Sequence, residues 1–280
     1  MLRAFVTAAA LAIVSAAAPA PAAAADAELA KAVANPARAA ENRARDGYRH
    51  PAETLAFWGV KPKQTVIELS PGSGYWTEIL APYARATGGT YVTTGADLDD
   101  PAVSDGARKG RANFEAKYAD AGKWGPVKVV NFGPKARPLG APGSADVVIT
   151  ARNIHNFTYQ PGMLDKVMGD AYAVLKPGGA LAVEEHRADP RAETPGMTDG
   201  YVAVATVVAA ARKAGFKLAA QSEINANPKD TKDHPFGVWT LAPSRNTAPN
   251  GQPANPAFDR TKYDAIGESD RMTLRFVKPG

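Results

Sequence analysis

Candidate strands and candidate helices alternate along most of this chain, and this alternation limits its possible folds more than any other feature. The candidate strands are apolar stretches at 64–69, 90–94, 128–132, 145–150, 180–184, 217–224 and 272–277. Candidate helices lie between them, at 75–85, 101–119, 163–175 and 199–214. This order predicts a parallel sheet with helices on both faces. Residues 225–269, rich in Pro, Asn, Gly and Asp, are predicted to form a long irregular insertion before the last strand.

The first 25 residues have the pattern of a secretory signal peptide. Arg3 supplies a positive charge, residues 5–18 are apolar and alanine-rich, and small residues at 22–25 precede Asp26. The apolar stretch is too short to span a bilayer, and no other segment is long and apolar enough to do so. We therefore expect a periplasmic or secreted protein whose residues 26–280 form one α/β domain. The alternative is a disordered alanine-rich tail.

Composition excludes several kinds of site. The chain has no cysteine, so disulfides, thiolate zinc sites and cysteine nucleophiles are impossible. The formal charge is +5, but Lys and Arg are scattered among acids, without a basic stripe interleaved with aromatic residues. Nucleic-acid binding is therefore not predicted.

The first candidate strand ends in an acid, Glu68, and a Gly-x-Gly turn follows at 72–74. Glycines let a backbone bend sharply and approach a ligand, and the following helix start offers free N–H groups. A dinucleotide fingerprint needs a third glycine where Thr77 stands. A phosphate loop needs Gly-Lys-Ser/Thr, and a nucleophile elbow needs glycines where Pro71 and Tyr75 stand. The turn thus predicts a nucleotide-type pocket of another kind.

An acid inside the strand before Gly-x-Gly resembles motif I of the class I S-adenosylmethionine-dependent methyltransferases. The likeness extends to residues 145–150 as the fourth strand, 175–181 as the turn into the fifth, and 214–216 before the sixth. A closer resemblance is to a group of predicted, exported bacterial methyltransferases. Its matching residues are Arg45-Asp46, Arg49, Pro51, 71–75, His155, Glu185-His186 and Asp270-Arg271.

This resemblance implies a doubly wound, Rossmann-like α/β fold with a seven-stranded, mostly parallel sheet whose last strand is antiparallel. It also implies S-adenosylmethionine as cofactor, with the glycine turn near its methionine part. The cofactor-binding residues that it implies are Glu68, Ser70, Pro71, Gly72, Ser73, Gly74, Tyr75, Asp97, Arg152 and Asn153. Two stretches depart from the family pattern. Residues 93–95 stand where an acid usually binds the ribose, with Asp97 two or three positions later, and residues 132–135 replace an acid near the adenine.

His155, His186 and Glu185 are the predicted catalytic residues. They follow the fourth and fifth candidate strands, and ligands of such sheets bind beyond the carboxyl ends of the strands. Histidine titrates near neutrality, and a base assists methyl transfer to a hydroxyl or ring nitrogen. The alternatives are a histidine bonded within its own loop and an ion cluster at 184–187. No metal site is predicted, because no single element shows ligand spacing.

An N-terminal cluster precedes the glycine turn and allows two interpretations. Residues 26–40 are predicted to be helical, Pro51 opens a short helix over 52–58, and between them lie Arg43, Arg45, Asp46, Arg49 and His50. The cluster is either a lid near the turn or, as is more usual for such runs, a solvated salt-bridged surface. Tyr75 and Trp76 either stack on a ligand or belong to the core.

The predicted function is S-adenosylmethionine-dependent methyl transfer to an unknown small molecule in the periplasm. The alternative is a non-catalytic periplasmic small-molecule-binding protein that retains the fold. It is motivated by the two departures and by a compartment where the cofactor is not expected to be abundant. A third possibility is an enzyme that uses a different ligand in the same pocket.

Overall fold

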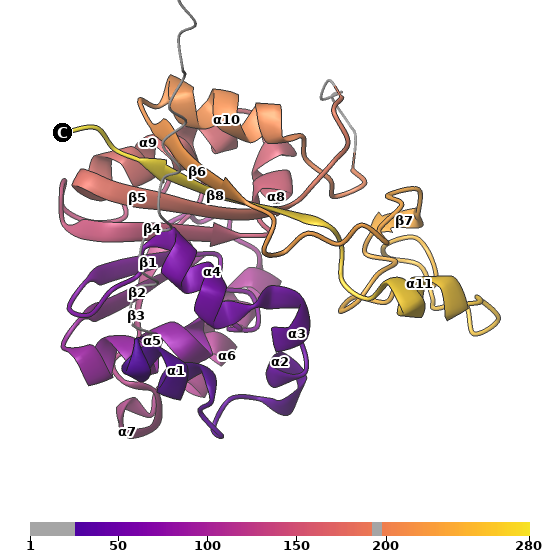
Figure 1. The fold of residues 1–280 in the computed structure, drawn as a ribbon, viewed down its shortest axis with the longest axis horizontal. Helices are drawn as coiled ribbons and strands as arrows, with labels where there is room; N and C mark the ends of the chain where they lie inside the picture. Colours follow the sequence, from indigo (N-terminus) through magenta and orange to yellow (C-terminus); the bar gives the residue numbers. More distant parts are fainter. Residues whose placement is uncertain (1–25, 192–197) are drawn as a thin grey trace, which may run out of the picture.

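The computed structural model describes residues 26–191 and 198–280, which form an α/β domain around one seven-stranded sheet (Figure 1). Its strands are β1 (Thr65–Leu69), β2 (Thr90–Ala96), β3 (Lys128–Phe132), β4 (Ala145–Ala151), β5 (Leu175–His186), β6 (Lys217–Ser222) and β8 (Arg271–Val277). They are ordered β3-β2-β1-β4-β5-β8-β6. Neighbours from β3 to β5 pair in parallel, whereas β8 is antiparallel to both β5 and β6. The predicted doubly wound sheet with an antiparallel last strand is confirmed.

Helices bury both faces of the sheet, which is why its central strands are almost continuously apolar. In β1, Val66 packs into a cluster shared with α1 (Ala27–Val33), α4 (Pro51–Trp58) and α5 (Thr77–Thr87). Ile67 and Leu69 point the other way, into the cluster formed by α9 (Met163–Val174) and α10 (Val204–Lys213). Glu68 lies between these apolar neighbours in the same strand and is 2% exposed. The alternation of a strand therefore places this carboxyl group inside the protein.

Several helices and strands begin or end at other residues than predicted, in two cases because of local side-chain contacts. The helix predicted at 101–119 is α6 (Asp105–Lys117), because the Ser104 hydroxyl caps it by accepting from Ala107 N–H. The helix predicted at 199–214 begins only at Val204, since Asp199 pairs with Arg191 in the preceding loop. β5 starts earlier than predicted, so the turn at 176–179 lies within that strand. The short helices α7 (Ala121–Trp124) and α8 (Ile154–Thr158) between the strands were not predicted, nor was α11 (Thr261–Ile266) in the insertion.

The N-terminal region is a series of short helices. A single helix over 26–40 is wrong beyond Val33, because Pro36 cannot continue it. Two helices follow, α2 (Ala40–Arg43) and α3 (Asp46–Arg49), and the helix opened by Pro51 is confirmed as α4. The buried Arg38 guanidinium donates to both Asp46 carboxylate oxygens at 2.7 Å. This ion pair fixes the path of the chain between α1 and α3.

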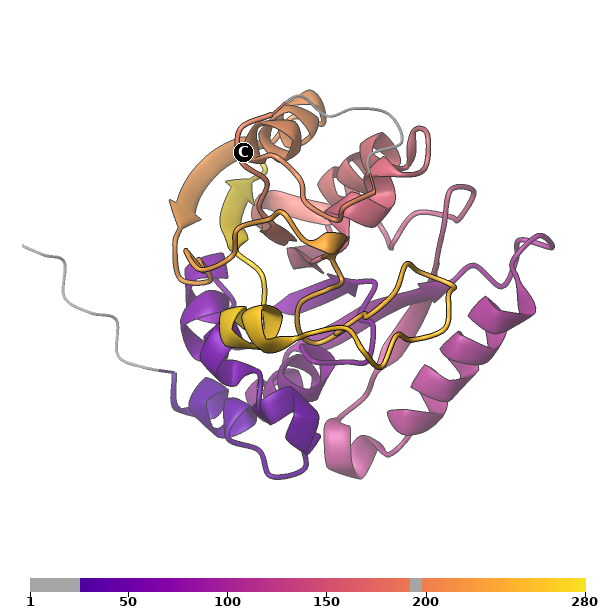
Figure 2. The ribbon, with the colours of Figure 1, turned by 90° about the vertical axis from the view of Figure 1, so that its right-hand side faces the viewer.

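The insertion at 225–269 is mostly irregular, as predicted, and contains β7 (Pro235–Val238) and α11 (Thr261–Ile266). Asn225 anchors its start by donating to the Thr54 and Thr273 hydroxyls. The insertion projects on the right in Figure 1, and Figure 2 shows it crossing in front of the central strands. No helix in the described ranges has the length and apolar character needed to cross a bilayer. The predicted signal peptide lies outside the described residues.

Candidate functional site

Three adjoining cavities lie at the carboxyl ends of β1, β2 and β4, and Ser70 and Asn153 contribute to the walls of all three. The first, of about 380 Å³, lies between the glycine turn and α6. The second, of about 200 Å³, extends toward α3 and the insertion, and we call it the central cleft. The third, of about 480 Å³, opens toward the loop after β3. This is the edge at which parallel sheets bind ligands.

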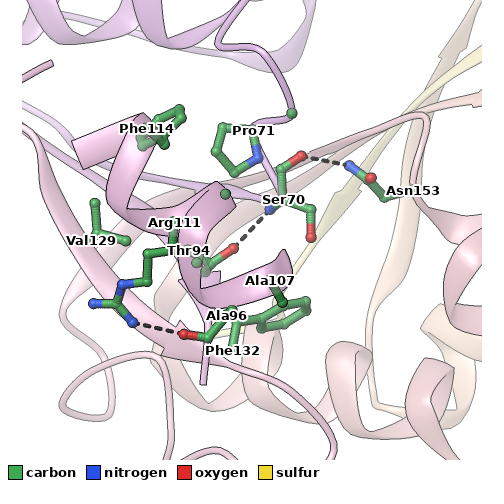
Figure 3. A pocket seen from close by; sticks show the side chains of 13 residues that line it. Ser70, Pro71, Thr94, Ala96, Ala107, Arg111, Phe114, Val129, Phe132 and Asn153 are labelled. Atoms are coloured by element: carbon green, nitrogen blue, oxygen red, sulfur yellow. Dashed lines mark hydrogen bonds between the residues drawn. The ribbon is translucent and has the colours of Figure 1, made fainter. Parts of the chain in front are cut away.

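Two side chains hold the beginning of the glycine turn. The Ser70 backbone is left-handed, with a φ of 50°. Its N–H donates to Thr94 Oγ1 at 2.8 Å, and its carbonyl accepts from the Asn153 side-chain amide at 3.1 Å (Figure 3). Thr94 stands in the stretch where the family carries a ribose-binding acid, and here it positions the turn. Asn153, predicted to bind the cofactor, also fixes the turn relative to β4.

The two glycines of the turn have different surroundings. Gly72 has a φ of 57°, and no heavy atom lies within 4 Å of a Cβ added there. The turn therefore presents bare backbone to the cavities at this point. Gly74 has a φ of 92°, and an added Cβ would lie 1.9 Å from the Tyr118 hydroxyl oxygen. Gly74 is required for packing against Tyr118, whereas Gly72 leaves room for a ligand.

Glu68 is a buried carboxyl group in the wall of the central cleft. It accepts hydrogen bonds from the Thr77 hydroxyl at 3.1 Å and from the Tyr91 hydroxyl. These hydroxyls, and not the turn N–H groups, are its protein partners. Burial raises the pKa of Glu68 to about 7, against the lowering effect of the two hydrogen bonds. A cation in the cleft would favour the ionised form.

The three predicted catalytic residues come together. Glu185 Oε1 lies 2.9 Å from His155 Nδ1, and Oε2 accepts the His155 backbone N–H at 3.1 Å. The His155 and His186 ring centroids are 5.3 Å apart, and His186 Nδ1 lies 2.5 Å from Ser269 Oγ. Burial, then the charges of His155 and Arg152, lower the pKa of His186 well below its usual value. Both imidazoles line the central cleft, and their Nδ1 atoms are held by protein groups.

The same three residues are the group, among those described, whose spacing would suit a metal ion. One ligand atom from each of His155, Glu185 and His186 lies within 4.8 Å of the others. However, both Glu185 oxygens already accept N–H hydrogen bonds, including one from the His186 backbone at 2.7 Å. A metal bound by this carboxylate would have to displace them. This arrangement favours an orienting role for Glu185, and a site without metal stays our prediction.

Arg49 is buried and Arg45 is partly buried against the end of the insertion, whereas Arg43 is exposed, so the interpretation as a solvated surface is wrong for Arg45 and Arg49. Arg45 and Arg49 donate to the Glu268 carboxylate at 2.6 and 3.1 Å. Arg271, at the start of β8, pairs with Glu268 at 3.0 Å and with Glu184 at 2.6 Å. The solvated interpretation fails because Glu268, distant in sequence, is folded onto α3.

Arg152 has no comparable partner. No hydrogen bond or ion pair joins its side chain to another residue within 26–191 or 198–280, and its Nε is buried. Its backbone is left-handed, with a φ of 58°, and its side chain lines the central cleft. Burial lowers its pKa, and the charges of Arg45 and Arg271 act in the same direction. This guanidinium is therefore available to a ligand.

The insertion forms the remaining wall of the central cleft through Val238, Trp239 and residues 242–244. The Trp239 ring lies edge-on to His155, with centroids 5.9 Å apart. Sequence reasoning missed these residues and Glu268. The one available signal was Trp239, the single tryptophan of a polar segment.

Other predicted cofactor residues lie in the same cavities. Asp97 directly follows β2, because this strand continues to Ala96, and it lines the 480 Å³ cavity. Pro71 and Ser73 line the central cleft. Tyr75 and Trp76 belong to the core, as one of the two interpretations predicted, and they also line the cleft. Stacking on a ligand stays a prediction. The helix begins after them, at Thr77.

No protein-family model matches the chain. It is 31% identical over 132 residues to the ubiquinone/menaquinone biosynthesis C-methyltransferase UbiE of Psychromonas ingrahamii. The matched stretch covers 47% of this chain and 46% of that protein. The match to UbiE of Citrobacter koseri has the same extent. The chain thus spans about half the length of the curated relatives that it matches.

Solved structures give the fold. A SAM-dependent methyltransferase from Aquifex aeolicus superposes with a TM-score of 0.50 at 18% identity, over 66% of this chain and 89% of that one. The [4+2]-cyclase SpnF superposes with a TM-score of 0.56 at 14% identity, over 90% and 92% of the two chains. Together with the strand order and the glycine turn, these likenesses establish that the chain has the fold of the class I S-adenosylmethionine-dependent methyltransferases.

Proposed function

We propose that this protein is an S-adenosylmethionine-dependent methyltransferase that acts on a small molecule. The observation that carries the proposal is that one cleft joins the glycine turn to the cluster of His155, Glu185 and His186. The cofactor, when bound, supplies an electrophilic methyl group on a sulfonium. Transfer then requires a nucleophile held in line with it and little water.

The residues present fit this cofactor. Glu68 offers a carboxylate for an ammonium group, and the Arg152 guanidinium, which pairs with no side chain among the described residues, offers donors for a carboxylate. Ser70, Asn153 and residues 71–75 form the turn, which leaves open space at Gly72. Asp97 provides an acid in the adjoining cavity for hydroxyl groups. The same residues were predicted from the sequence to bind the cofactor.

His155 is the proposed general base. A Glu185 carboxylate can only accept at His155 Nδ1, which leaves Nε2 as the basic nitrogen. A second hydrogen bond, from the His155 backbone to Glu185, fixes the residue further. His186, with its pKa lowered by burial, stays neutral and orients the acceptor. Removing a proton from a ring hydroxyl activates both the oxygen and the ring carbons, which accords with relatives named as C-methyltransferases.

Export is part of the proposal, and it is supported by the sequence of residues 1–25. Cleavage before Asp26 would leave the first helix complete, since Asp26 caps α1 by accepting from Glu28 and Leu29 N–H groups. Asp26 also accepts a hydrogen bond from the Tyr83 hydroxyl. N-terminal sequencing of protein recovered from the periplasm should begin at Asp26. Recovery of the uncleaved chain from the cytoplasm would contradict export.

Titration calorimetry with S-adenosylmethionine and S-adenosylhomocysteine tests cofactor binding. The absence of both binding heat and a thermal shift at millimolar ligand would contradict the proposal. Turnover is tested by incubating the protein with S-adenosylmethionine and the small-molecule fraction of the source cells, with S-adenosylhomocysteine measured by mass spectrometry. A His155→Gln variant should bind the cofactor and form about 10²–10⁴-fold less product, as expected for loss of a general base.

The second candidate function is a non-catalytic periplasmic binding protein that retains this fold. It is favoured by the use of Thr94 to hold the turn, in the stretch where the methyltransferases that the chain resembles usually carry a ribose-binding acid. Mass spectrometry of small molecules that copurify with the protein discriminates between this function and methyl transfer. A stable ligand other than the adenosyl cofactor, with no product formed, would support it.

A further inference from the structure

The central cleft adjoins a group of buried charges that its own residues do not balance. The group consists of four guanidinium groups, Arg45, Arg49, Arg152 and Arg271, and two carboxylates, Glu184 and Glu268. We call it the arginine cluster, and it has two more positive than negative charges. A buried charge without a partner is strongly unfavourable. Glu185 lies near but is occupied by hydrogen bonds from His155 and His186.

Arg49 has unused hydrogen-bond donors in this cluster. Its residue is 0% exposed, and its Nε donates to Glu268 at 3.1 Å. Both terminal nitrogens are buried and have no hydrogen-bond partner among the described residues. The guanidinium lies 4.4 Å from the Tyr75 ring centroid, a contact that attracts the cation without satisfying its N–H groups. Arg49 also lines the central cleft.

The proposed cofactor does not neutralise this cluster. Its carboxylate can pair with Arg152 and its ammonium with Glu68, while its sulfonium adds one positive charge. With Arg152 paired in this way, the arginine cluster still has one more positive than negative charge, beside the positive sulfonium. A second ligand that carries negative charge would balance this excess. The two terminal nitrogens of Arg49, which lines the cleft, are donors without a partner among the described residues.

We propose that the methyl acceptor of this site is a small organic acid, with a carboxylate or phosphate group that Arg49 binds in the central cleft. This inference rests on the proposed function for the identity of the second ligand. The cleft of about 200 Å³ admits only a small body, and Trp76 and Trp239 form flat walls for it. The acid group at Arg49 would fix the acceptor while His155 acts on its nucleophilic atom.

Calorimetry on the full-length mature protein saturated with S-adenosylhomocysteine tests the inference. The probes are benzoate and phenyl phosphate, with benzyl alcohol as the neutral match. Both acids, or one of them, should bind at least about tenfold more tightly than the alcohol. The two acids distinguish a carboxylate site from a phosphate site. Equal binding of the alcohol and the acids would overturn the proposal.

Variants of Arg49 show whether this residue binds the acid or the cofactor. Arg49→Gln should weaken the preferred acid about tenfold and leave S-adenosylhomocysteine affinity within about threefold. If the Gln variant does not fold, Arg49→Lys replaces it, because lysine keeps the charge beside Glu268. Arg49→Lys should lose part of the affinity for the preferred acid. Arg212→Gln, which removes an exposed arginine on α10, is the matched control and should change neither ligand.

The outcomes distinguish the two proposals. If Arg49→Gln weakens S-adenosylhomocysteine as much as the acid, Arg49 binds the cofactor and the inference is wrong. If S-adenosylhomocysteine does not bind the wild type, the proposed function fails. The acid probes are then titrated into the free protein, where selective binding that depends on Arg49 still supports an acid site. Absence of acid binding in both states overturns the inference.

Discussion

Replacing Glu68 by Gln tests whether burial raises the pKa of this carboxyl group and so makes the stability of the fold depend on pH. The change preserves shape and leaves a carbonyl oxygen to accept from Thr77 and Tyr91. In the wild type, burial raises the pKa from 4.5 to about 7, so the folded state holds the proton more tightly than the unfolded state. The stabilisation from the protonated form is complete below pH 4.5 and is lost as the pH rises toward about 7. Glutamine cannot ionise, so the Glu68→Gln variant keeps this stabilisation over the whole pH range.

The shift gives the size of the effect. At 1.36 kcal/mol per pKa unit, a rise of about 2.5 units makes the ionised wild type about 3 kcal/mol less stable than Glu68→Gln in alkaline solution. Because part of this difference is already present at pH 5, the gap should grow by about 2–3 kcal/mol between about pH 5 and pH 8.

Urea unfolding of both proteins without ligand, at the two pH values, measures the gap. Other titrating groups are common to both proteins and cancel in the difference. Glu53→Gln, which removes an exposed carboxylate from α4, is the control and should show no such growth. A gap between wild type and Glu68→Gln that stays constant within about 0.5 kcal/mol would refute the reasoning, because Glu68 would then be ionised at ordinary cost. The same variant should bind S-adenosylhomocysteine about tenfold more weakly, since it lacks the charge for the ammonium.

Further variants examine the turn, the base and the insertion. Gly74→Ala should destabilise the fold by about 2 kcal/mol or more, because overlap of its Cβ with the Tyr118 hydroxyl adds to the strain of a positive φ. Gly72→Ala carries only the strain of its positive φ, on the order of 1 kcal/mol, so it should melt between the wild type and Gly74→Ala and bind the cofactor more weakly. Equal melting temperatures for the two would contradict this. Glu185→Gln should lower kcat about 10²-fold or more with KM for the cofactor unchanged, as the base loses its orientation; an effect on KM alone would argue against that role. Trp239→Ala should raise KM for the acceptor and leave calorimetric affinity for S-adenosylhomocysteine unchanged, and the reverse pattern would place the cofactor under the insertion. Activity should survive dialysis against EDTA, and its loss with recovery on adding a divalent metal would show that the histidine cluster binds one.

Local sequence was sufficient for the sheet and the glycine turn. Apolar runs such as Val147 to Ile149 are buried on both faces, and such burial makes strands recognisable without tertiary information. The positions of Glu68, His155 and Glu185 at strand ends followed from the rule that parallel strands end at one edge. Helix starts were less accurate, because caps such as Ser104 compete with nearby prolines and turns for the same backbone groups.

The sequence by itself determined the alternating α/β architecture and the edge of the sheet that carries the site, because both depend on periodicity within short segments. Only the tertiary structure decided which distant groups meet there. Glu268 follows Arg45 and Arg49 by more than two hundred residues, yet it pairs with both and changes a run of charges from a solvated surface into a buried cluster. Trp239 likewise reaches His155 only through the path of the insertion. Burial and charge balance at the cleft depend on these long-range contacts, and local sequence does not specify them.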